Sequence, residues 1–159
     1  MSITFRPLGD ADLEQVFAWE KDAAAVEMAA FTRADPSDRA AFDAHNARVA
    51  ANPQNLRLAI EDDGVFVGTV ASFWTEGERE VSYWIDPARW GRGIASAALR
   101  SFLLVERTRP LVGRVAAHNL GSAKVLEHAG FVRIGQDSGY AEGIGRETVE
   151  FLYRFDGTV

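Results

Sequence analysis

The stretch from residue 80 to residue 106, EVSYWIDPARWGRGIASAALRSFLLVE, limits the fold of this chain more than any other. It begins with β-branched or aromatic side chains at every second position, a pattern that predicts a strand over 80–85. Pro87 ends that strand because proline has no N–H to donate to a neighbouring strand. A turn with two glycines follows at 90–93, and a helix is predicted over 94–105. The predicted apolar stripe of that helix consists of Ile94, Ala98, Leu99, Phe102, Leu103 and Val105.

A strand, a glycine turn and a helix start, in this order, can form an anion-binding site. Unpaired backbone N–H groups point out of the helix start, and glycine allows a phosphate to approach the backbone closely. Two glycines that only turn the chain are the simpler alternative. The turn is not a dinucleotide fingerprint, whose third glycine would fall at Ser96, and no Gly-Lys-Ser/Thr closes it as in a Walker A loop.

The element order predicted from the whole chain is βααβββαβαββ, which indicates an α/β protein. Its sheet is expected to be mostly antiparallel, with one parallel pair joined by a right-handed crossover through the helix at 94–105. Residues 22–35 show no clear period, and 137–146, with three glycines, predicts a loop. The predicted strands are 3–6, 56–60, 65–74, 80–85, 111–118, 131–134 and 148–155, and the predicted helices start near residues 10, 36, 94 and 119.

Composition limits the class of protein. A length of 159 residues predicts a single domain over 1–159 with a sizeable core. The chain has no cysteine, which excludes disulfides and a cysteine nucleophile and fits a cytoplasmic location. No apolar run approaches the ~18 residues of a membrane span, and the first residues lack the apolar core of a signal peptide. The net charge of −6 argues against a nucleic-acid surface and favours cationic substrates such as amines. We expect no metal site, because no carboxylate lies at ligand spacing from His45, His118 or His128.

Two blocks of the sequence resemble one family. Residues 90–95 are similar to motif A of the GNAT superfamily of acyl-CoA N-acyltransferases, Gln/Arg-x-x-Gly-x-Gly/Ala. Trp90 departs from the first position of that motif, in a way that resembles the RimJ/RimL branch. Residues 118–131, HNLGSAKVLEHAGF, are similar to the branch's Asn-x-x-Ser block that ends in Gly-Phe. The opening residues 3–8, followed by Asp12, are also like that branch, so the resemblance covers most of the chain.

The resemblance implies the GNAT fold and acetyl-CoA as co-substrate. In that fold the strands expected at 80–85 and 111–118 splay apart and leave room for the pantetheine arm. Backbone N–H groups of residues 92–96 would hold the pyrophosphate, and Arg89 and Arg92 could compensate for the negative charge of the chain. The residues expected to bind acetyl-CoA are Trp84, Ile85, Trp90, Gly91, Arg92, Gly93, Ile94, Ala95, Ser96 and Asn119. For Asn119, helix capping is a compatible second role.

Direct transfer of an acyl group to an amine needs a base and a group that assists the leaving thiolate, but no covalent nucleophile. Glu80, at the start of the central strand, is the expected base, with Glu78 as its rival and an exposed strand-end charge as the alternative. In many GNAT enzymes a tyrosine protonates the thiolate, and its position here is Leu126. Ser122, one helical turn earlier, is therefore the expected acid, unless it is only a small packing residue.

From these features we expect a cytoplasmic N-acetyltransferase of RimJ/RimL type, acting on a primary amine in a ternary complex. The resemblance also places Met28 and Phe31 at the acceptor site, although ordinary core contacts explain them equally well. Two alternatives stay open, namely a non-catalytic CoA-binding sensor and a different phosphate ligand in the glycine turn. Dimers are frequent in the family, so a homodimer is one expected assembly. The acceptor, whether a protein N-terminus, a polyamine, an antibiotic or another amine, is left open.

Overall fold

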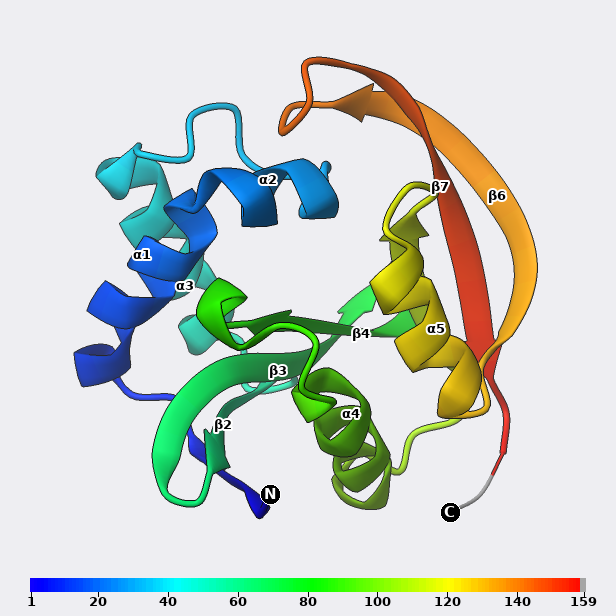
Figure 1. Cartoon of the computed structure of the whole chain (residues 1–159), viewed down its shortest axis with the longest axis horizontal. Helices are drawn as coiled ribbons and strands as arrows, with labels where there is room; N and C mark the ends of the chain where they lie inside the picture. The colour runs from blue at the N-terminus through cyan, green and yellow to red at the C-terminus, as the bar shows by residue number, and fades with distance from the viewer. Residues whose placement is uncertain (158–159) are drawn as a thin grey trace.

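One seven-stranded sheet organises the computed structural model, which describes residues 1–157 (Figure 1). The strand order is β1-β2-β3-β4-β5-β7-β6. Neighbouring strands run antiparallel except for β4 and β5, which are parallel. The predicted α/β class with a mostly antiparallel sheet is therefore confirmed. The strands are β1 Ile3–Pro7, β2 Leu56–Asp62, β3 Val65–Thr75, β4 Glu78–Ile85, β5 Leu111–Ala116, β6 Val132–Ala141 and β7 Arg146–Phe155.

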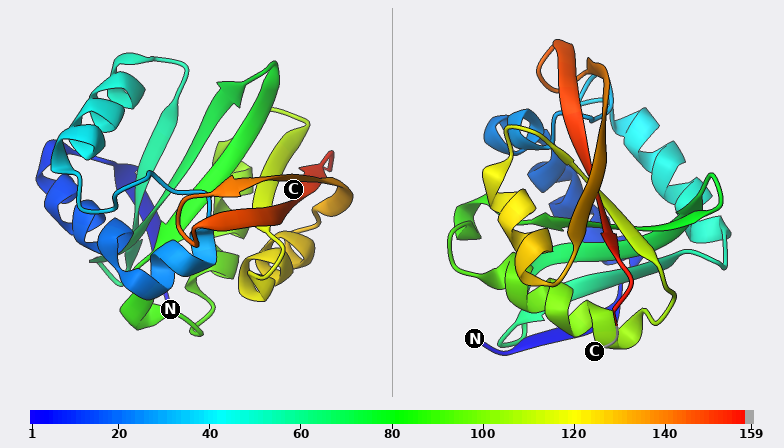
Figure 2. Two further views of the ribbon diagram at one scale, coloured as in Figure 1. Left: turned by 90° about the horizontal axis from the view of Figure 1, so that it is seen from above. Right: turned by 90° about the vertical axis from the view of Figure 1, so that its right-hand side faces the viewer.

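Helices cover both faces of the sheet. Figures 1 and 2 show α1, α2 and α3 on one side of the central strands and α4 on the other, where α5 packs beside α4. Within residues 1–157, no helix is long and apolar enough to cross a membrane. The helices are α1 Leu13–Lys21, α2 Ala23–Ala29, α3 Arg39–Ala51, α4 Ile94–Val105 and α5 Leu120–His128, with 3₁₀ turns at Asp10–Asp12 and Pro87–Arg89.

The apolar face of α4 forms the centre of the core, packed against β1, β3 and β4. Phe102 is fully buried and meets Phe5 edge to face, with ring centroids 6.2 Å apart. The predicted stripe is confirmed except at Val105, which is 50% exposed. Val105 is the last residue of α4, and sequence periodicity gives the phase of a helix but not the point where its packing partner stops. The buried residues of the stripe are Ile94, Ala98, Leu99, Phe102 and Leu103.

The parallel strands β4 and β5 are paired over a very short distance. Their register contains two pairs, Arg79 with Leu111 and Glu80 with Val112. Beyond these pairs, β4 stays paired with β3 as far as Ile85, while β5 stays paired with β7. Each strand therefore keeps its outer partner while the two inner edges separate. This is the splayed parallel pair that the family resemblance implies.

Two elements differ from the sequence prediction. Residues 23–29, which show no clear period, form α2, where the Asp22 carboxylate accepts a hydrogen bond from the Ala25 N–H at 3.0 Å. Residues 137–141 belong to β6, so the loop predicted over 137–146 is reduced to a turn at 142–145. Most side chains of β6 are exposed on both faces, and its pairing with β7 comes from backbone register. Such a strand lacks the alternating apolar pattern by which a sequence reveals a strand.

A buried polar network lies where β4 and β5 meet. The Glu106 carboxylate, at the end of α4, accepts a hydrogen bond from the Ser72 hydroxyl at 2.6 Å and from Arg79 Nη2 at 3.2 Å. Arg79 also donates through Nη1 to the carbonyl of Gln54 at 2.8 Å, and the Thr108 N–H donates to Glu106 at 3.0 Å. The arginine and glutamate side chains are only 7% and 6% exposed. The network ties the start of β4 to the end of α4.

Loss of the Glu106 charge should destabilise the fold. Burial opposes ionisation of this carboxyl, but the hydrogen bonds from Ser72, Thr108 and Arg79 outweigh it, and its pKa lies below the ordinary value of 4.5. Glu106→Gln would leave the Arg79 charge without a counter-ion, which typically costs about 3 kcal/mol of unfolding free energy. A carboxyl with a lowered folded pKa contributes its full stabilisation above the unfolded pKa and loses it as the pH falls. The deficit of the variant should therefore be largest near pH 7 and shrink below about pH 4.5, as measured by urea unfolding.

The matched control is Asp43→Asn, which breaks the exposed pair of Arg39 with Asp43 (2.8 Å, 40% and 55% exposed). An exposed pair within one helix contributes about 0.5 kcal/mol or less. Equal losses in the two variants would contradict a structural role for the buried network.

Candidate active site

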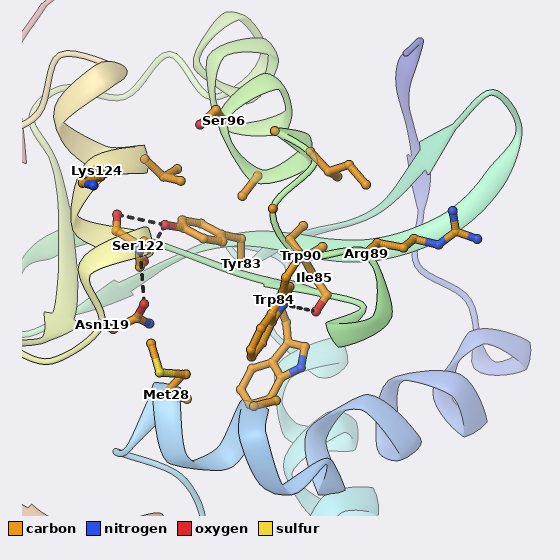
Figure 3. A pocket seen from close by; sticks show the side chains of 18 of the residues that line it. Met28, Tyr83, Trp84, Ile85, Arg89, Trp90, Ser96, Asn119, Ser122 and Lys124 are labelled. Atoms are coloured by element: carbon orange, nitrogen blue, oxygen red, sulfur yellow. Dashed lines mark hydrogen bonds between the residues drawn. The ribbon is translucent and has the colours of Figure 1, made fainter.

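A pocket of about 510 Å3 opens where β4 and β5 diverge (Figure 3). Four segments line it, namely α2, the second half of β4, the turn that leads into α4, and α5. Most of the predicted site residues come together here. Glu80 and Arg92 do not line the pocket. The predicted residues that do are Trp84, Ile85, Trp90, Gly91, Gly93, Ile94, Ala95, Ser96, Asn119 and Ser122.

The glycine turn brings the start of α4 to the pocket wall. Gly91 and Gly93 both have φ of 79°, a backbone conformation that other residues adopt only with strain. Gly93 is the N-cap of α4 and has no side chain to cap it, so the first N–H groups of the helix are left for an external partner. Because the helix dipole adds a partial positive charge here, the turn can bind an anionic group.

Trp90, which departs from motif A, has a structural role in this turn. Its indole N–H donates to the carbonyl of Ile85 at 3.1 Å and so ties the turn back to the end of β4. Arg92, by contrast, is exposed and lies outside the pocket lining. The neighbouring cation in the lining is Arg89, whose Nε lies 3.4 Å from a carboxylate oxygen of Asp86.

Trp84 offers an unused hydrogen-bond donor. Its indole Nε1 is buried and finds no hydrogen-bond partner within residues 1–157. Figure 3 shows the ring at the end of β4, directed toward α2 and Met28. A buried donor without a partner costs free energy, commonly 1–3 kcal/mol. A ligand that places a carbonyl or other acceptor atom against this indole would remove that cost.

The wall formed by α5 contains a polar cluster. The Asn119 side chain accepts a hydrogen bond from the Ser122 N–H at 3.2 Å and so caps α5, as the sequence predicts. The Ser122 hydroxyl lies 2.6 Å from the phenol of Tyr83. Burial raises the pKa of Tyr83 to about 12, although the hydrogen bond with Ser122 opposes the shift. The sequence marks Tyr83 only as a strand residue, since no spacing relates it to Ser122, 39 residues later in a helix.

Glu80 lies on the other side of β4 from Tyr83, because side chains alternate along a strand. Its carboxylate is 3.3 Å from Arg114 of β5, and Arg114 is 3.4 Å from Glu150 of β7. Burial raises the pKa of Glu80 above its ordinary value, while Arg114 opposes the shift. Glu78, the rival candidate, is exposed. Glu80 is therefore a partly buried carboxylate at the residue where the parallel pairing ends.

The charged side chains in the described lining of the pocket are basic. They are Arg89, which is paired with Asp86, and Lys124, and the lining contains no aspartate or glutamate. The net charge of the whole chain is −6, so acidic residues are concentrated elsewhere. Met28 also lines the pocket, whereas Phe31 lies outside the lining and is 38% exposed. The arrangement favours a long, anionic ligand with an apolar segment.

A sheet with one splayed parallel pair, a glycine turn and a helix start at the opening define the GNAT acetyltransferase fold. The family model described as an acetyltransferase (GNAT) domain matches residues 2–132. The chain therefore belongs to the GNAT acetyltransferase family. No sequence among the curated proteins matches it.

Solved structures support the fold. An N-acetyltransferase from Staphylococcus aureus Mu50 is 20% identical, with a TM-score of 0.82 over 98% of this chain and 99% of that one. Spermidine N-acetyltransferase from Vibrio cholerae, in complex with CoA and spermine, is 17% identical, with a TM-score of 0.81 over 97% and 95%. Mycobacterium smegmatis RimJ, in complex with CoA-disulfide, is 24% identical, with a TM-score of 0.81 over 98% and 82%.

The geometry of the turn predicts that replacing Gly93 by alanine destabilises the fold, whereas the same change at Gly121 does not. Gly93→Ala should lower the unfolding free energy by about 1–2 kcal/mol, because it forces a side chain into the left-handed region. Gly121→Ala is the matched control, since Gly121 is in α5 and an added Cβ would meet only the Asn119 amide oxygen at 3.9 Å. Alanine favours a helix, so this control should be neutral or stabilising by about 0.5 kcal/mol. Urea unfolding measures both, and equal stability of the two variants would contradict the strained turn.

Proposed function

We propose that this protein is an acetyl-CoA-dependent N-acetyltransferase that transfers an acetyl group to a primary amine. The observation that carries the proposal is the pocket at the splay, which combines an uncapped helix start, basic side chains and an unpartnered indole donor. The helix start and the basic side chains suit the negatively charged pyrophosphate of an acyl-CoA. The indole donor suits a carbonyl oxygen of its amide-containing arm or of its thioester. Two solved structures with this fold are complexes, one with CoA and spermine and the other with CoA-disulfide.

Different residues would hold different parts of acetyl-CoA. The N–H groups at the start of α4, residues 94–96, would bind the pyrophosphate with help from Arg89 and Lys124. Beyond Glu80, the edge of β4 that faces β5 has no strand partner within residues 1–157, so its backbone near Trp84 and Ile85 can pair with the amides of the arm. The side-chain amide of Asn119 would contact the same arm. Arg92 is not needed for this binding and is better regarded as a solvated residue of the turn.

Glu80 is the proposed base. A carboxylate with a raised pKa is a better proton acceptor for an ammonium than an ordinary one, provided that it stays ionised at neutral pH. The contact with Arg114 favours the ionised form. Glu80 lies at the gap between β4 and β5 but on the face opposite Tyr83, so the amine would approach the thioester from the side of α2 and β7. The amine nitrogen would then attack the thioester carbon directly, in a ternary complex.

The narrower assignment is to the RimJ/RimL branch, in the cytoplasm. The two motif blocks at residues 90–95 and 118–131 and the similarity to a mycobacterial RimJ support the branch. The carboxylates of Glu80 and Glu150, both paired with Arg114, would attract a positively charged acceptor amine. Protein N-termini and small-molecule amines are both acceptors of the proposed class.

The test is CoA release from acetyl-CoA across a panel of amines, with short peptides that have free N-termini, polyamines and aminoglycosides. Amine-dependent release supports the proposal, and the best acceptor names the substrate class. Binding of acetyl-CoA without release by any amine would instead favour a CoA-binding module. Absence of both binding and release would contradict the proposed pocket.

Substitution of the base should remove most activity. Glu80→Gln keeps the shape of the side chain and should lower kcat by about 10²–10⁴ while acetyl-CoA binding is retained. Because the base acts when deprotonated, wild-type kcat/KM should rise with pH along a limb above pH 4.5, and the variant should lack that limb. Glu78→Gln is the matched control and should stay within about twofold of wild type, since Glu78 is exposed. Similar rates for Glu80→Gln and Glu78→Gln would eliminate Glu80 as the base.

The unpartnered indole should contribute to co-substrate binding. Trp84→Phe keeps an aromatic ring but lacks the N–H, and it should weaken acetyl-CoA binding about tenfold, the scale of one hydrogen bond. Trp74→Phe is the control, because Trp74 is 48% exposed on β3 and outside the pocket. Titration calorimetry would measure both affinities. Unchanged affinity in Trp84→Phe would show that the donor is not used by the co-substrate.

A further inference from the structure

Tyr83 and Ser122 form a pair of hydroxyl groups within the pocket lining (Figure 3). They come from different elements, β4 and α5, and their oxygens are 2.6 Å apart. The rest of the Tyr83 side chain is partly buried and packs against the main hydrophobic core. A buried phenol usually needs a hydrogen-bond partner, and Ser122 supplies it here.

The chemistry of the two groups determines which of them donates. A phenol is a stronger acid than an aliphatic alcohol and therefore a better hydrogen-bond donor, whereas the alcohol oxygen is the better acceptor. The other acceptor near the phenol, the Ser122 carbonyl, is 3.4 Å away and belongs to α5, where the helix already uses carbonyl groups. Tyr83 therefore donates to the Ser122 hydroxyl oxygen. The proton of Ser122 is then free for a ligand in the pocket.

Neither hydroxyl is suited to protonate a thiolate. An ordinary thiol has a pKa of about 8.5, while burial raises the pKa of Tyr83 to about 12 and an aliphatic alcohol is a weaker acid still. Proton transfer from either group to sulfur would be unfavourable. A hydrogen bond from a neutral hydroxyl to the developing negative charge is favourable, and such bonds are among the stronger ones in proteins.

We propose that Tyr83 is a positioning residue, which orients the Ser122 hydroxyl so that it donates a hydrogen bond to the thioester sulfur as that sulfur leaves. This inference rests on the proposed function. In the step, the neutral amine nitrogen forms the C–N bond with the thioester carbon and passes one proton to Glu80, which has by then released the first proton of the ammonium to water. The C–S bond breaks with its electron pair on sulfur. The sulfur departs as a thiolate held by the Ser122 hydrogen bond, and it takes its proton from water after release. In this proposal Ser122 acts as a hydrogen-bond donor to the sulfur, whereas the sequence resemblance led us to expect an acid.

The test compares Tyr83→Phe, Ser122→Ala and the double variant in single-turnover acetyl transfer to the best amine of the panel. Single-turnover kinetics separate the chemical step from product release. Each single variant should lower the rate about tenfold, while the affinity for acetyl-CoA stays within about twofold of wild type. The double variant should be no slower than the slower single variant. Both substitutions act through one interaction, the hydrogen bond from the Ser122 hydroxyl to the sulfur.

Tyr153→Phe is the matched control. Tyr153 is also a buried tyrosine, and its phenol donates to the Glu127 carboxylate at 3.0 Å, outside the pocket. This variant should keep the wild-type rate, although it too loses the hydrogen bond of a part-buried phenol. A general loss of packing would affect Tyr83→Phe and Tyr153→Phe alike.

Three outcomes would overturn the inference. They are a wild-type rate in Tyr83→Phe, multiplicative losses in the double variant, and equal losses in the Tyr83 and Tyr153 variants. Failure of the proposed function is a different result, since wild type itself would then show no amine-dependent release of CoA.

Discussion

The short parallel pairing of β4 and β5 is the constraint on which the rest of the molecule depends. Two residue pairs join the strands, and the buried network of Arg79, Glu106 and Ser72 lies at this point. A longer pairing would close the gap that leads into the pocket. Without this pairing, no backbone hydrogen bonds would hold the starts of β4 and β5 side by side. The network therefore has a simple physical role: it holds the start of β4 against the end of α4, so that the strands diverge from a fixed position.

The distribution of charge follows from the same geometry. The pocket near the start of α4 has basic residues and no described carboxylate in its lining. The carboxylates of Glu80 in β4 and Glu150 in β7 are instead paired with Arg114, on the strand β5 between them. A strand presents alternate side chains to opposite faces, so β4 can offer a phenol to one side and a carboxylate to the other. An anionic co-substrate and a cationic amine would then each meet a surface of opposite charge, and their reacting atoms would meet at the gap.

The sequence predicted the elements with strong signals and missed those held by tertiary contacts. The strand–turn–helix of 80–105 was correct because alternation, Pro87 and the glycines are local signals. Helix α2 was missed because a short run of alanines has no period, and its position depends on contacts made after folding. Most of β6 was missed because its exposed residues do not alternate. No sequence signal pairs Tyr83 with Ser122, or Glu106 with Ser72 and Arg79. These contacts join residues far apart in the sequence and form only in the folded chain. The roles of Glu80 and Ser122 remain predictions.

The most direct test of acetyl-CoA binding at the splay is hydrogen exchange of the backbone amides with and without acetyl-CoA. If the account is correct, saturating acetyl-CoA will slow exchange at residues 93–96, at the start of α4, and at Ile85, whose N–H faces the gap because those of Trp84 and Asp86 face β3. Exchange in α3 and in the hairpin of β2 and β3 should be unchanged, because these segments lie away from the pocket. Protection confined to other segments, or no protection at saturation, would contradict the proposed site.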